Sequence, residues 1–270
     1  MSNVAASKTG GRMLGGYFVL LAIFLYAPLA VMIVFAFDDS FVQTFPWSGF
    51  TTKWFHNAFS NNELIDALER SVWIGIAAAI GATLLGLITA VGMTAHKLRL
   101  RGLVTALVLL PLVIPYIVLA VGLLILLNWL GLERSLWAVM LGHIAVSVPY
   151  CLLIILPRLR TIDQAIVDAA RDLGAGPWTA FRRVSLPLIF PALFSSALIA
   201  FTISFDEFAI ASFLVPAGEG TYPVYVYSGA RTPALQPQIL ALGSVVVVLS
   251  LVIVVGAELF RTRAERRLAV

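Results

Sequence analysis

Two adjacent carboxylates, Asp206 and Glu207, lie near the end of an otherwise apolar stretch. Ionisable groups inside such a stretch are costly and usually face a cavity or a partner. Ser195, Thr202 and Asp206 share one helical stripe, at i, i+7 and i+11, and Ser196 and Glu207 share the adjacent stripe. A stripe ending in carboxylates could line a passage for a cationic substrate, because a carboxylate attracts an ammonium by a few kcal/mol at intermediate dielectric. The alternative is a structural ion pair, or a helix end at the outer surface.

Aromatic rings near these carboxylates would add cation–π attraction for a cationic solute. Phe205 directly precedes Asp206, and Phe201 and Phe208 are close in sequence. The candidate substrate pathway therefore comprises Ser195, Thr202, Phe205, Asp206 and Glu207.

The sequence offers no set of residues for catalysis or metal binding. It contains no GxxxxGK[ST] loop, so the chain is not expected to hydrolyse ATP itself. His56, His96 and His143 are scattered, and we interpret His143 as a hydrogen-bonded packing residue rather than a proton relay. The single cysteine, Cys151, lies in an apolar run and is interpreted as a structural thiol. A membrane enzyme would need a clustered catalytic set, so this class is disfavoured, and neither metal nor cofactor is expected.

The composition indicates a membrane protein. Of 270 residues, 60% are hydrophobic and only 12% are charged, and the mean hydropathy is +0.97. Soluble proteins are roughly 25% charged, and disordered chains are poor in apolar residues, so both classes are excluded. The net charge of +4 is more typical of basic cytoplasmic loops than of nucleic-acid binding.

Six apolar stretches predict an all-α protein with six transmembrane helices, each needing about 20 residues. They run near 14–37, 68–95, 103–127, 136–156, 190–215 and 239–260. If both ends and every second loop share one side, that side carries 14 of the 18 Lys and Arg residues. Cytoplasmic loops hold this excess, so both termini are predicted to be cytoplasmic.

We predict one transmembrane domain over residues 1–270. Its periplasmic loops are expected at about 38–67, 128–135 and 216–238, and its longest cytoplasmic loop at 158–189. The second apolar stretch repeats a small residue every four positions, which favours close helix packing: Ala78, Ala82, Gly86 and Ala90. Pro111, Pro115 and Pro149 predict kinks, either beside a passage or as purely structural bends.

The cytoplasmic loop 158–189 is long enough for two short helices. Thr161 and Gln164 fit a capping box at the start of the first, and one apolar face follows at Ile166, Ala169, Ala170 and Leu173. Residues 174–177, Gly-Ala-Gly-Pro, end that helix, and the second has Trp178, Phe181 and Val184 on one side. Such a hairpin could lie on the bilayer, or it could dock into the groove of a soluble partner.

The stretch DAARDLGAGPWTAFRRVSLP resembles the EAA loop of ABC-importer permeases, in which Glu-Ala-Ala is followed by Gly and later by Ile-x-Leu-Pro. The matching residues are Asp168, Ala169, Ala170, Gly174, Val184, Leu186 and Pro187, with Asp replacing Glu and Val replacing Ile. In that family the loop is the coupling helix that sits in a groove of the ATPase subunit. The resemblance implies the same coupling role here.

The resemblance extends over nearly the whole chain. Segments around WSGFT and WF at 47–55, SFDEFAIASFL at 204–214 and YPVYVYS at 222–228 look like those of polyamine-type permeases. The chain is most similar to the shorter permease subunit of spermidine/putrescine importers. This implies a type I ABC importer permease fold in a bacterial inner membrane.

The implied partners are a second permease subunit, two ATPase subunits that bind ATP and Mg, and a periplasmic or lipid-anchored substrate-binding protein. Residues implied to meet the binding protein are Trp47, Tyr222, Tyr225 and Tyr227, although such aromatics also anchor at membrane interfaces. Alternatives are an importer of another small organic solute such as an amino-acid derivative or opine-like compound, an anion importer and an ion-coupled secondary transporter. The acidic fifth stretch disfavours the anion, and the EAA-like loop disfavours the ion-coupled carrier.

Overall fold

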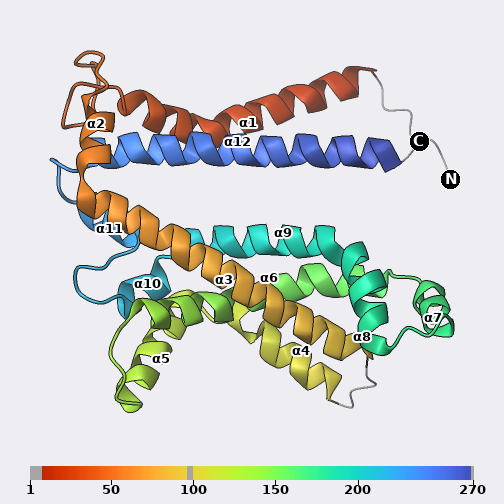
Figure 1. Ribbon diagram of the computed structural model, residues 1–270. Helices are drawn as coiled ribbons and strands as arrows, with labels where there is room; N and C mark the ends of the chain where they lie inside the picture. The colour runs from red at the N-terminus through yellow and green to blue at the C-terminus, as the bar shows by residue number, and fades with distance from the viewer. Residues whose placement is uncertain (1–7, 96–99, 269–270) are drawn as a thin grey trace. The chain divides into compact units, whose positions relative to one another are not determined.

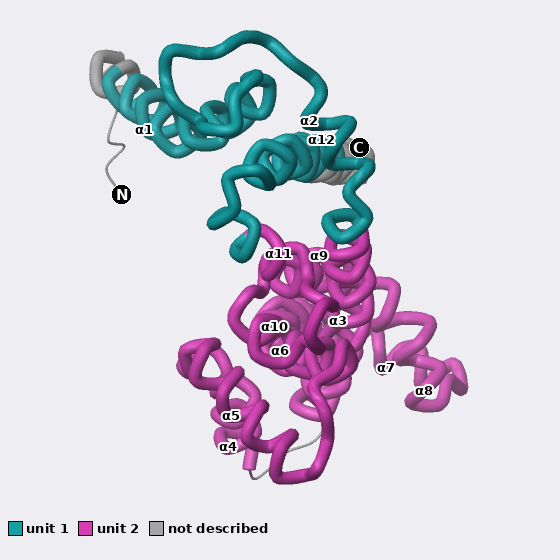
Figure 2. The backbone as a smooth tube through the Cα atoms, turned by 90° about the vertical axis from the view of Figure 1, so that its left-hand side faces the viewer, with its two compact units in different colours: residues 1–65, 227–270 teal, residues 66–226 magenta. Residues whose placement is uncertain are grey.

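The described chain is built almost entirely of helices (Figure 1). The computed structural model describes the backbone of residues 8–95 and 100–268, and the side chains within these ranges except at 8–12, 95, 253–254 and 257–268. His96 lies outside the described residues. The chain divides into two compact units, residues 1–65 with 227–270 and residues 66–226 (Figure 2), and each is described by itself.

The first unit contains α1 (Lys8–Phe35), α2 (Lys53–Ser60) and α12 (Gln236–Leu268). Helix α12 packs against both α1 and α2. Asp38 holds the loop between α1 and α2, because its buried carboxylate accepts a hydrogen bond from Ser48 N (2.9 Å) and its carbonyl accepts one from Trp54 Nε1 (2.7 Å). This loop therefore has an internal polar anchor although it contains no regular helix.

The second unit is organised around α6 (Leu136–Arg160). Helix α9 packs along α6, and α10 packs against both α6 and α5. The other helices of the unit are α4 (Arg101–Leu109), α5 (Tyr116–Trp129), α7 (Gln164–Asp172), α8 (Pro177–Ala180), α9 (Leu186–Phe205) and α10 (Ala209–Leu214). Helices α3 (Asn62–Ala95) and α11 (Tyr222–Gly229) cross the boundary between the two units.

The small-residue ridge of α3 is packed as the sequence predicts. Ala78, Ala82 and Ala90 are fully buried. A Cβ atom added to Gly86 would lie 2.7 Å from Cys151 Cβ and 3.2 Å from the Leu152 backbone nitrogen. Because real Cβ atoms do not approach so closely, the absence of a side chain at Gly86 is what lets α3 contact α6 there.

The prolines of the third apolar stretch break the helix rather than bending it slightly. A short 3₁₀ turn, Leu110–Leu112, follows α4, and α5 starts at Tyr116 after Pro115. The helical segments on either side form an angle of 103°. Proline lacks the backbone N–H that would continue the helix, so Pro111 and Pro115 together account for the break.

Four helices of the described residues are long and apolar enough to span a membrane: Met13–Phe35, Asn62–Thr94, Leu136–Arg160 and Pro177–Phe205. The two bent helical segments Arg101–Leu112 and Tyr116–Trp129 make a fifth span if together they cross the membrane once. The sixth predicted stretch falls on α12, whose apolar part among the described residues is Gln236–Val252. The fold is therefore an all-helical membrane protein with four to five candidate spans in the described structure.

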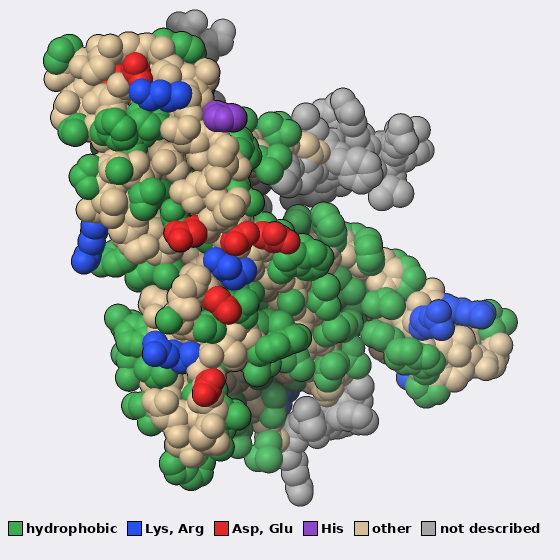
Figure 3. Space-filling view, turned by 60° about the vertical axis from the view of Figure 1, so that its left-hand side comes forward, with side chains coloured by type: hydrophobic (Ala, Val, Ile, Leu, Met, Phe, Trp, Pro, Cys, Tyr) green, Lys and Arg blue, Asp and Glu red, His purple; other side chains and the backbone are tan. Residues whose placement is uncertain are grey.

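Hydrophobic side chains cover much of the face shown in Figure 3, and charged side chains occur there in small groups. Large apolar side chains of α1 are exposed along its length, among them Phe18, Leu20 and Phe24. An apolar helix surface of this kind is stable only in lipid or against another protein chain.

Replacing Gly86 with alanine should destabilise the protein, because the new methyl group would meet Cys151 and the Leu152 backbone. We expect the free energy of unfolding to fall by about 1–3 kcal/mol, as for other overpacked sites. Gly92→Ala is the matched control, since nothing lies within 4 Å of its added Cβ. Thermal melting of the two purified variants in detergent measures the difference, and equal melting temperatures would contradict the packing described here.

Candidate functional site

The polar stripe predicted on the fifth apolar stretch lies on an exposed face of α9. Ser195, Thr202 and Asp206 are all exposed. The two hydroxyl groups bond within the helix, to Pro191 O and Leu198 O, each at 2.9 Å. Within the described residues the Asp206 carboxylate has neither an ion-pair partner nor a side-chain hydrogen bond, so its charge is available to a solute or a neighbouring chain.

The second carboxylate, Glu207, faces the opposite way. Helix α9 ends at Phe205 and α10 begins at Ala209, so the predicted continuous stretch is broken here. The buried Glu207 carboxylate accepts hydrogen bonds from Ile210 N at 2.8 Å and Ala211 N at 3.1 Å. Those backbone groups would have no partner within a helix that starts at this point, so Glu207 caps α10.

His143 on α6 meets the same segment and is almost fully buried. Its Nδ1 lies 2.7 Å from Ser204 Oγ, and its Nε2 lies 3.2 Å from Glu207 Oε2. The prediction that His143 is a hydrogen-bonded packing residue is confirmed. Ser204 had no sequence signal, because a serine on an apolar helix usually bonds its own backbone. The contacts of Glu207 match the structural ion pair considered for the carboxylates, whereas its burial does not match a helix end at the outer surface.

Phe205 belongs to a row of three aromatic rings. Its centroid lies 5.7 Å from that of Phe201 and 6.1 Å from that of Tyr222. Ser71 Oγ accepts a hydrogen bond from Tyr222 N at 2.8 Å, which fixes the start of α11 on α3. Burial raises the pKa of Tyr222 to about 12, so its hydroxyl stays neutral at physiological pH.

The other residues predicted to meet a binding protein differ in exposure. Tyr227 is exposed, and its hydroxyl accepts a hydrogen bond from Arg231 Nη2 at 2.8 Å, with the guanidinium over the ring. Trp47 is exposed in the loop between α1 and α2, and Tyr225 is half-buried. Tyr227 and Trp47 thus present aromatic surface, whereas Tyr222 is partly covered by Phe205.

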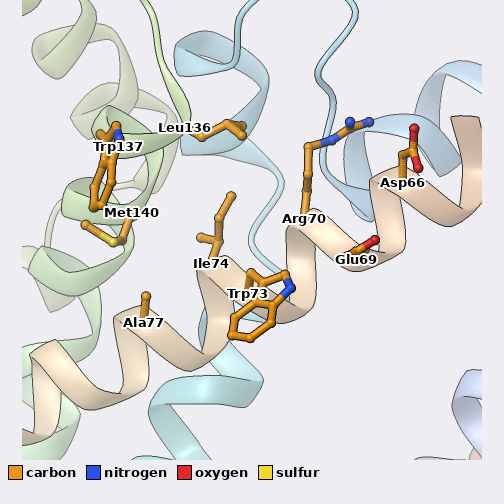
Figure 4. Close-up of a pocket in the computed structure, with 9 residues that line it drawn as sticks. All are labelled: Asp66, Glu69, Arg70, Trp73, Ile74, Ala77, Leu136, Trp137 and Met140. Carbon is orange, nitrogen blue, oxygen red and sulfur yellow. The ribbon is translucent and has the colours of Figure 1, made fainter.

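A cavity of about 570 Å³ lies between α3 and α6 (Figure 4). Charged side chains from the first turns of α3 occupy one end, and apolar side chains of α3 and α6 the other. Its lining comprises Asp66, Glu69, Arg70, Trp73, Ile74, Ala77, Leu136, Trp137 and Met140. Arg70 Nε donates to Gly220 O at 3.0 Å, which ties the loop before α11 to this wall. None of the predicted pathway residues lines this cavity.

The loop 158–189 forms the predicted helical hairpin, with one correction at its start. Asp163, rather than Thr161, is the N-cap of α7, and its carboxylate accepts a hydrogen bond from Ala165 N at 2.9 Å. Thr161 instead caps the end of α6 and donates its hydroxyl to Arg158 O at 2.8 Å. Because α6 extends to Arg160, Thr161 is the C-cap of α6 and is not the N-cap of α7. The capping-box prediction was therefore wrong.

Gly174 ends α7 as predicted. Its φ of +87° lies in the left-handed region that favours glycine, and Gly174 N donates to Arg171 O at 2.8 Å. The apolar face of the hairpin is uncovered within the described chain, since Leu173 is 90% exposed and Trp178 and Ile166 are exposed as well. Exposed apolar side chains of this kind on a short amphipathic helix indicate that the helix contacts a partner protein or the bilayer surface.

Asp168, the first residue of the EAA-like motif, is exposed on α7. It lies 3.2 Å from Gln164 Nε2 and 3.7 Å from Arg171 Nη1. The end of the motif leads directly into the bundle. A π-helical turn, Phe181–Ser185, contains Val184, and α9 starts at Leu186 with Pro187 in its first turn. The hairpin is thus continuous with the helix that carries the polar stripe.

Comparison with known proteins identifies relatives over nearly the full chain. The model of the family described as binding-protein-dependent transport system inner membrane component matches residues 82–268. The spermidine/putrescine transport system permease protein PotC of Escherichia coli (strain K12) is 32% identical over 250 residues, covering 92% of this chain and 94% of that protein. The putrescine transport system permease protein PotI of the same organism is 34% identical, covering 90% and 89%.

A solved structure has the same fold. The crystal structure of a bacterial ABC transporter that imports the acidic polysaccharide alginate contains a chain with a TM-score of 0.72 to this one. The match covers 93% of this chain and 94% of that chain at 22% sequence identity. At this identity the likeness concerns the arrangement of the helices and leaves the solute open.

Proposed function

This chain belongs to the family of binding-protein-dependent transport system inner membrane components, and we propose that it forms half of the passage through which an importer admits a small cationic solute such as spermidine or putrescine. It is a multi-pass inner-membrane permease subunit of an ABC importer. Subunits of this family are not the ATP-hydrolysing part of the complex and carry no cofactor.

The cationic solute is supported by one observation above the others: at the end of the exposed face of α9, the Asp206 carboxylate is exposed and has no ion-pair partner within the described residues. Thr202 and Ser195 continue that face, and Phe205 lies beside it in a row of aromatic rings. Carboxylates and aromatic faces are the groups that bind ammonium ions. The permeases PotC and PotI, named for spermidine and putrescine, are 32% and 34% identical to the chain.

The membrane topology that we propose has six spans. The bent pair formed by α4 and α5 counts as one span, and α12 as the sixth. Both termini and the α7–α8 hairpin are cytoplasmic, because 14 of the 18 Lys and Arg residues then lie on the cytoplasmic side. The loops near 38–67, 128–135 and 216–238 face the periplasm.

The partners that we propose are a second permease subunit, two ATP-binding subunits and a substrate-binding protein. The uncovered apolar face of the hairpin, with Leu173 and Trp178, would dock in a groove of an ATP-binding subunit. Its motif residues are Asp168, Ala169, Ala170, Gly174, Val184, Leu186 and Pro187. Exposed Trp47 and Tyr227 on the periplasmic side are candidate contacts for the binding protein.

The proposal is tested by ATP hydrolysis of the complete transporter, reconstituted in proteoliposomes with its binding protein. Spermidine, putrescine, amino acids and sulfate are compared as stimulating solutes. Stimulation by spermidine or putrescine is expected. Stimulation by another solute alone would overturn the polyamine assignment, and uptake driven by an ion gradient without ATP would overturn the importer class.

Replacing Asp206 with asparagine should lower spermidine uptake without affecting assembly. We expect a fall of about tenfold or more, because the attraction between a carboxylate and an ammonium about 4 Å apart is on the order of 1–4 kcal/mol. Radiolabelled spermidine uptake into proteoliposomes measures this. Glu133→Gln, which removes another exposed carboxylate, serves as the control, and wild-type uptake in Asp206→Asn would remove Asp206 from the pathway.

Replacing Gly174 with valine should weaken assembly with the ATP-binding subunits. A left-handed conformation costs an L-residue about 1–2 kcal/mol, and a β-branched side chain is especially strained there. Gly176→Val is a closely matched control, because Gly176 has φ −66° and ψ 164°, and nothing lies within 4 Å of its added Cβ. Co-purification of the ATP-binding subunits with each variant is the measurement. Equal recovery with both would contradict the docking role of the hairpin.

A further inference from the structure

Glu207 is engaged on all sides by groups of this chain, which separates its role from that of Asp206. Its carboxylate accepts backbone hydrogen bonds from Ile210 and Ala211 and lies 3.2 Å from His143 Nε2. The side chain is 2% exposed. A carboxylate enclosed in this way has little free capacity for a passing solute, whereas the neighbouring Asp206 is exposed.

The imidazole of His143 contacts Ser204 through one ring nitrogen and Glu207 through the other. Nδ1 is hydrogen-bonded to the Ser204 hydroxyl at 2.7 Å, whereas Nε2 faces Glu207 Oε2 at 3.2 Å without hydrogen-bond geometry. A protonated ring donates to Ser204 and forms an ion pair with Glu207 across that distance. Ionisable groups buried in an apolar bundle usually face a partner, and here His143, Ser204 and Glu207 face one another, so the three side chains depend on one another.

The backbone around this contact is shaped for close approach. Gly142 precedes His143 on α6, and a Cβ atom added there would lie 2.7 Å from Ile210 Cγ2. Ile210 is also the residue whose N–H is capped by Glu207. The first turn of α10 is therefore held to α6 in two ways: by the polar contact between His143 and Glu207, and by the close packing of Ile210 on Gly142. The two contacts involve different residues of the sequence.

We propose that His143, Ser204 and Glu207 form a polar clasp that positions Asp206. The clasp ties the last turn of α9, through Ser204, and the first turn of α10, through Glu207, to one side chain of α6. Asp206 lies between these two anchors and is thereby kept on the exposed face with Thr202 and Ser195. Glu207 and His143 are positioning residues that do not touch the solute. This inference rests on the proposed pathway role of Asp206.

Replacing Glu207 by glutamine or by alanine distinguishes positioning from direct binding. Glutamine removes the charge, and its carbonyl oxygen can take the place of Oε2, the atom that caps Ile210 and Ala211 and faces His143 Nε2. Alanine removes every contact. We expect Glu207→Ala and His143→Ala to lower the maximal rate of spermidine uptake by the complete reconstituted transporter about tenfold, because buried groups lose their partners, and Glu207→Gln to retain most of it.

Equal losses in Glu207→Gln and Glu207→Ala would show that the charge itself matters and would overturn the clasp. His56→Ala is the control for histidine removal, since His56 is exposed on α2. Each variant is first checked for wild-type co-purification with the ATP-binding subunits. If His143→Ala fails this check, Ser204→Ala and His143→Gln replace it, with the same expectation and the same contrary result.

A second measurement does not depend on the solute. Asp206→Cys in the complete complex is labelled with a charged, water-soluble thiol reagent; the single native cysteine, Cys151, is buried. We expect Glu207→Gln to leave the labelling rate close to that of Asp206→Cys alone, and Glu207→Ala or His143→Ala to change it about fivefold or more, as loss of a buried contact implies. Unchanged labelling in all variants would overturn the clasp. Absence of spermidine uptake by the wild-type complex would instead overturn the proposed solute and leave the labelling result valid.

Discussion

The contact between α6 and the segment that joins α9 to α10 constrains the whole of the second unit. In lipid, apolar side chains gain little by leaving one apolar surrounding for another, so helices associate through close packing and hydrogen bonds. Helix α6 provides both. Its residues Val139 and Val146 pack with Ile210 and Leu214 at one end, and Leu152 and Ile155 pack with Ala82 and Ala200 at the other. His143 supplies the polar contact between α6 and the α9–α10 break, through Ser204 and Glu207.

Features determined by local chemistry could be predicted from the sequence, and the structure contains them. Glycine at position 174 indicates a left-handed helix end, and φ is +87° there. Pro111 and Pro115 indicate a kink, which in the structure is a break with 103° between the two segments, whereas α6 continues through Pro149. A small residue every fourth position indicates a packed ridge, which Gly86 allows to contact Cys151. In each case a glycine or a proline sets which backbone conformations or approaches are possible at its own position.

Features determined by tertiary contacts could not be predicted in this way. Neither glycine nor proline marks the break at 206–208, which exists because Glu207 satisfies the first N–H groups of α10 and His143 satisfies Glu207. In an unbroken helix, the side chains of Asp206 and Glu207 would point only 100° apart. In the structure the helix ends here, and Asp206 is exposed whereas Glu207 is buried. The misplaced cap of α7 has a similar origin, because the length of α6 decides which residue is free to cap.

The polar stripe and the cytoplasmic hairpin belong to one continuous helical path. The π-helical turn Phe181–Ser185 joins α8 to α9, and the 20 residues of α9 extend about 30 Å to Asp206. Helix α9 packs along α6 over this length, and the clasp closes the contact at the far end. Closely packed helices resist bending and move as a body. In the proposed importer, a displacement imposed on the hairpin by the ATP-binding subunits would therefore be carried by the α6–α9 pair to Asp206. A flexible connection at the α9–α10 break would lose this displacement, which is the mechanical reason for the proposed clasp of His143, Ser204 and Glu207 at that position.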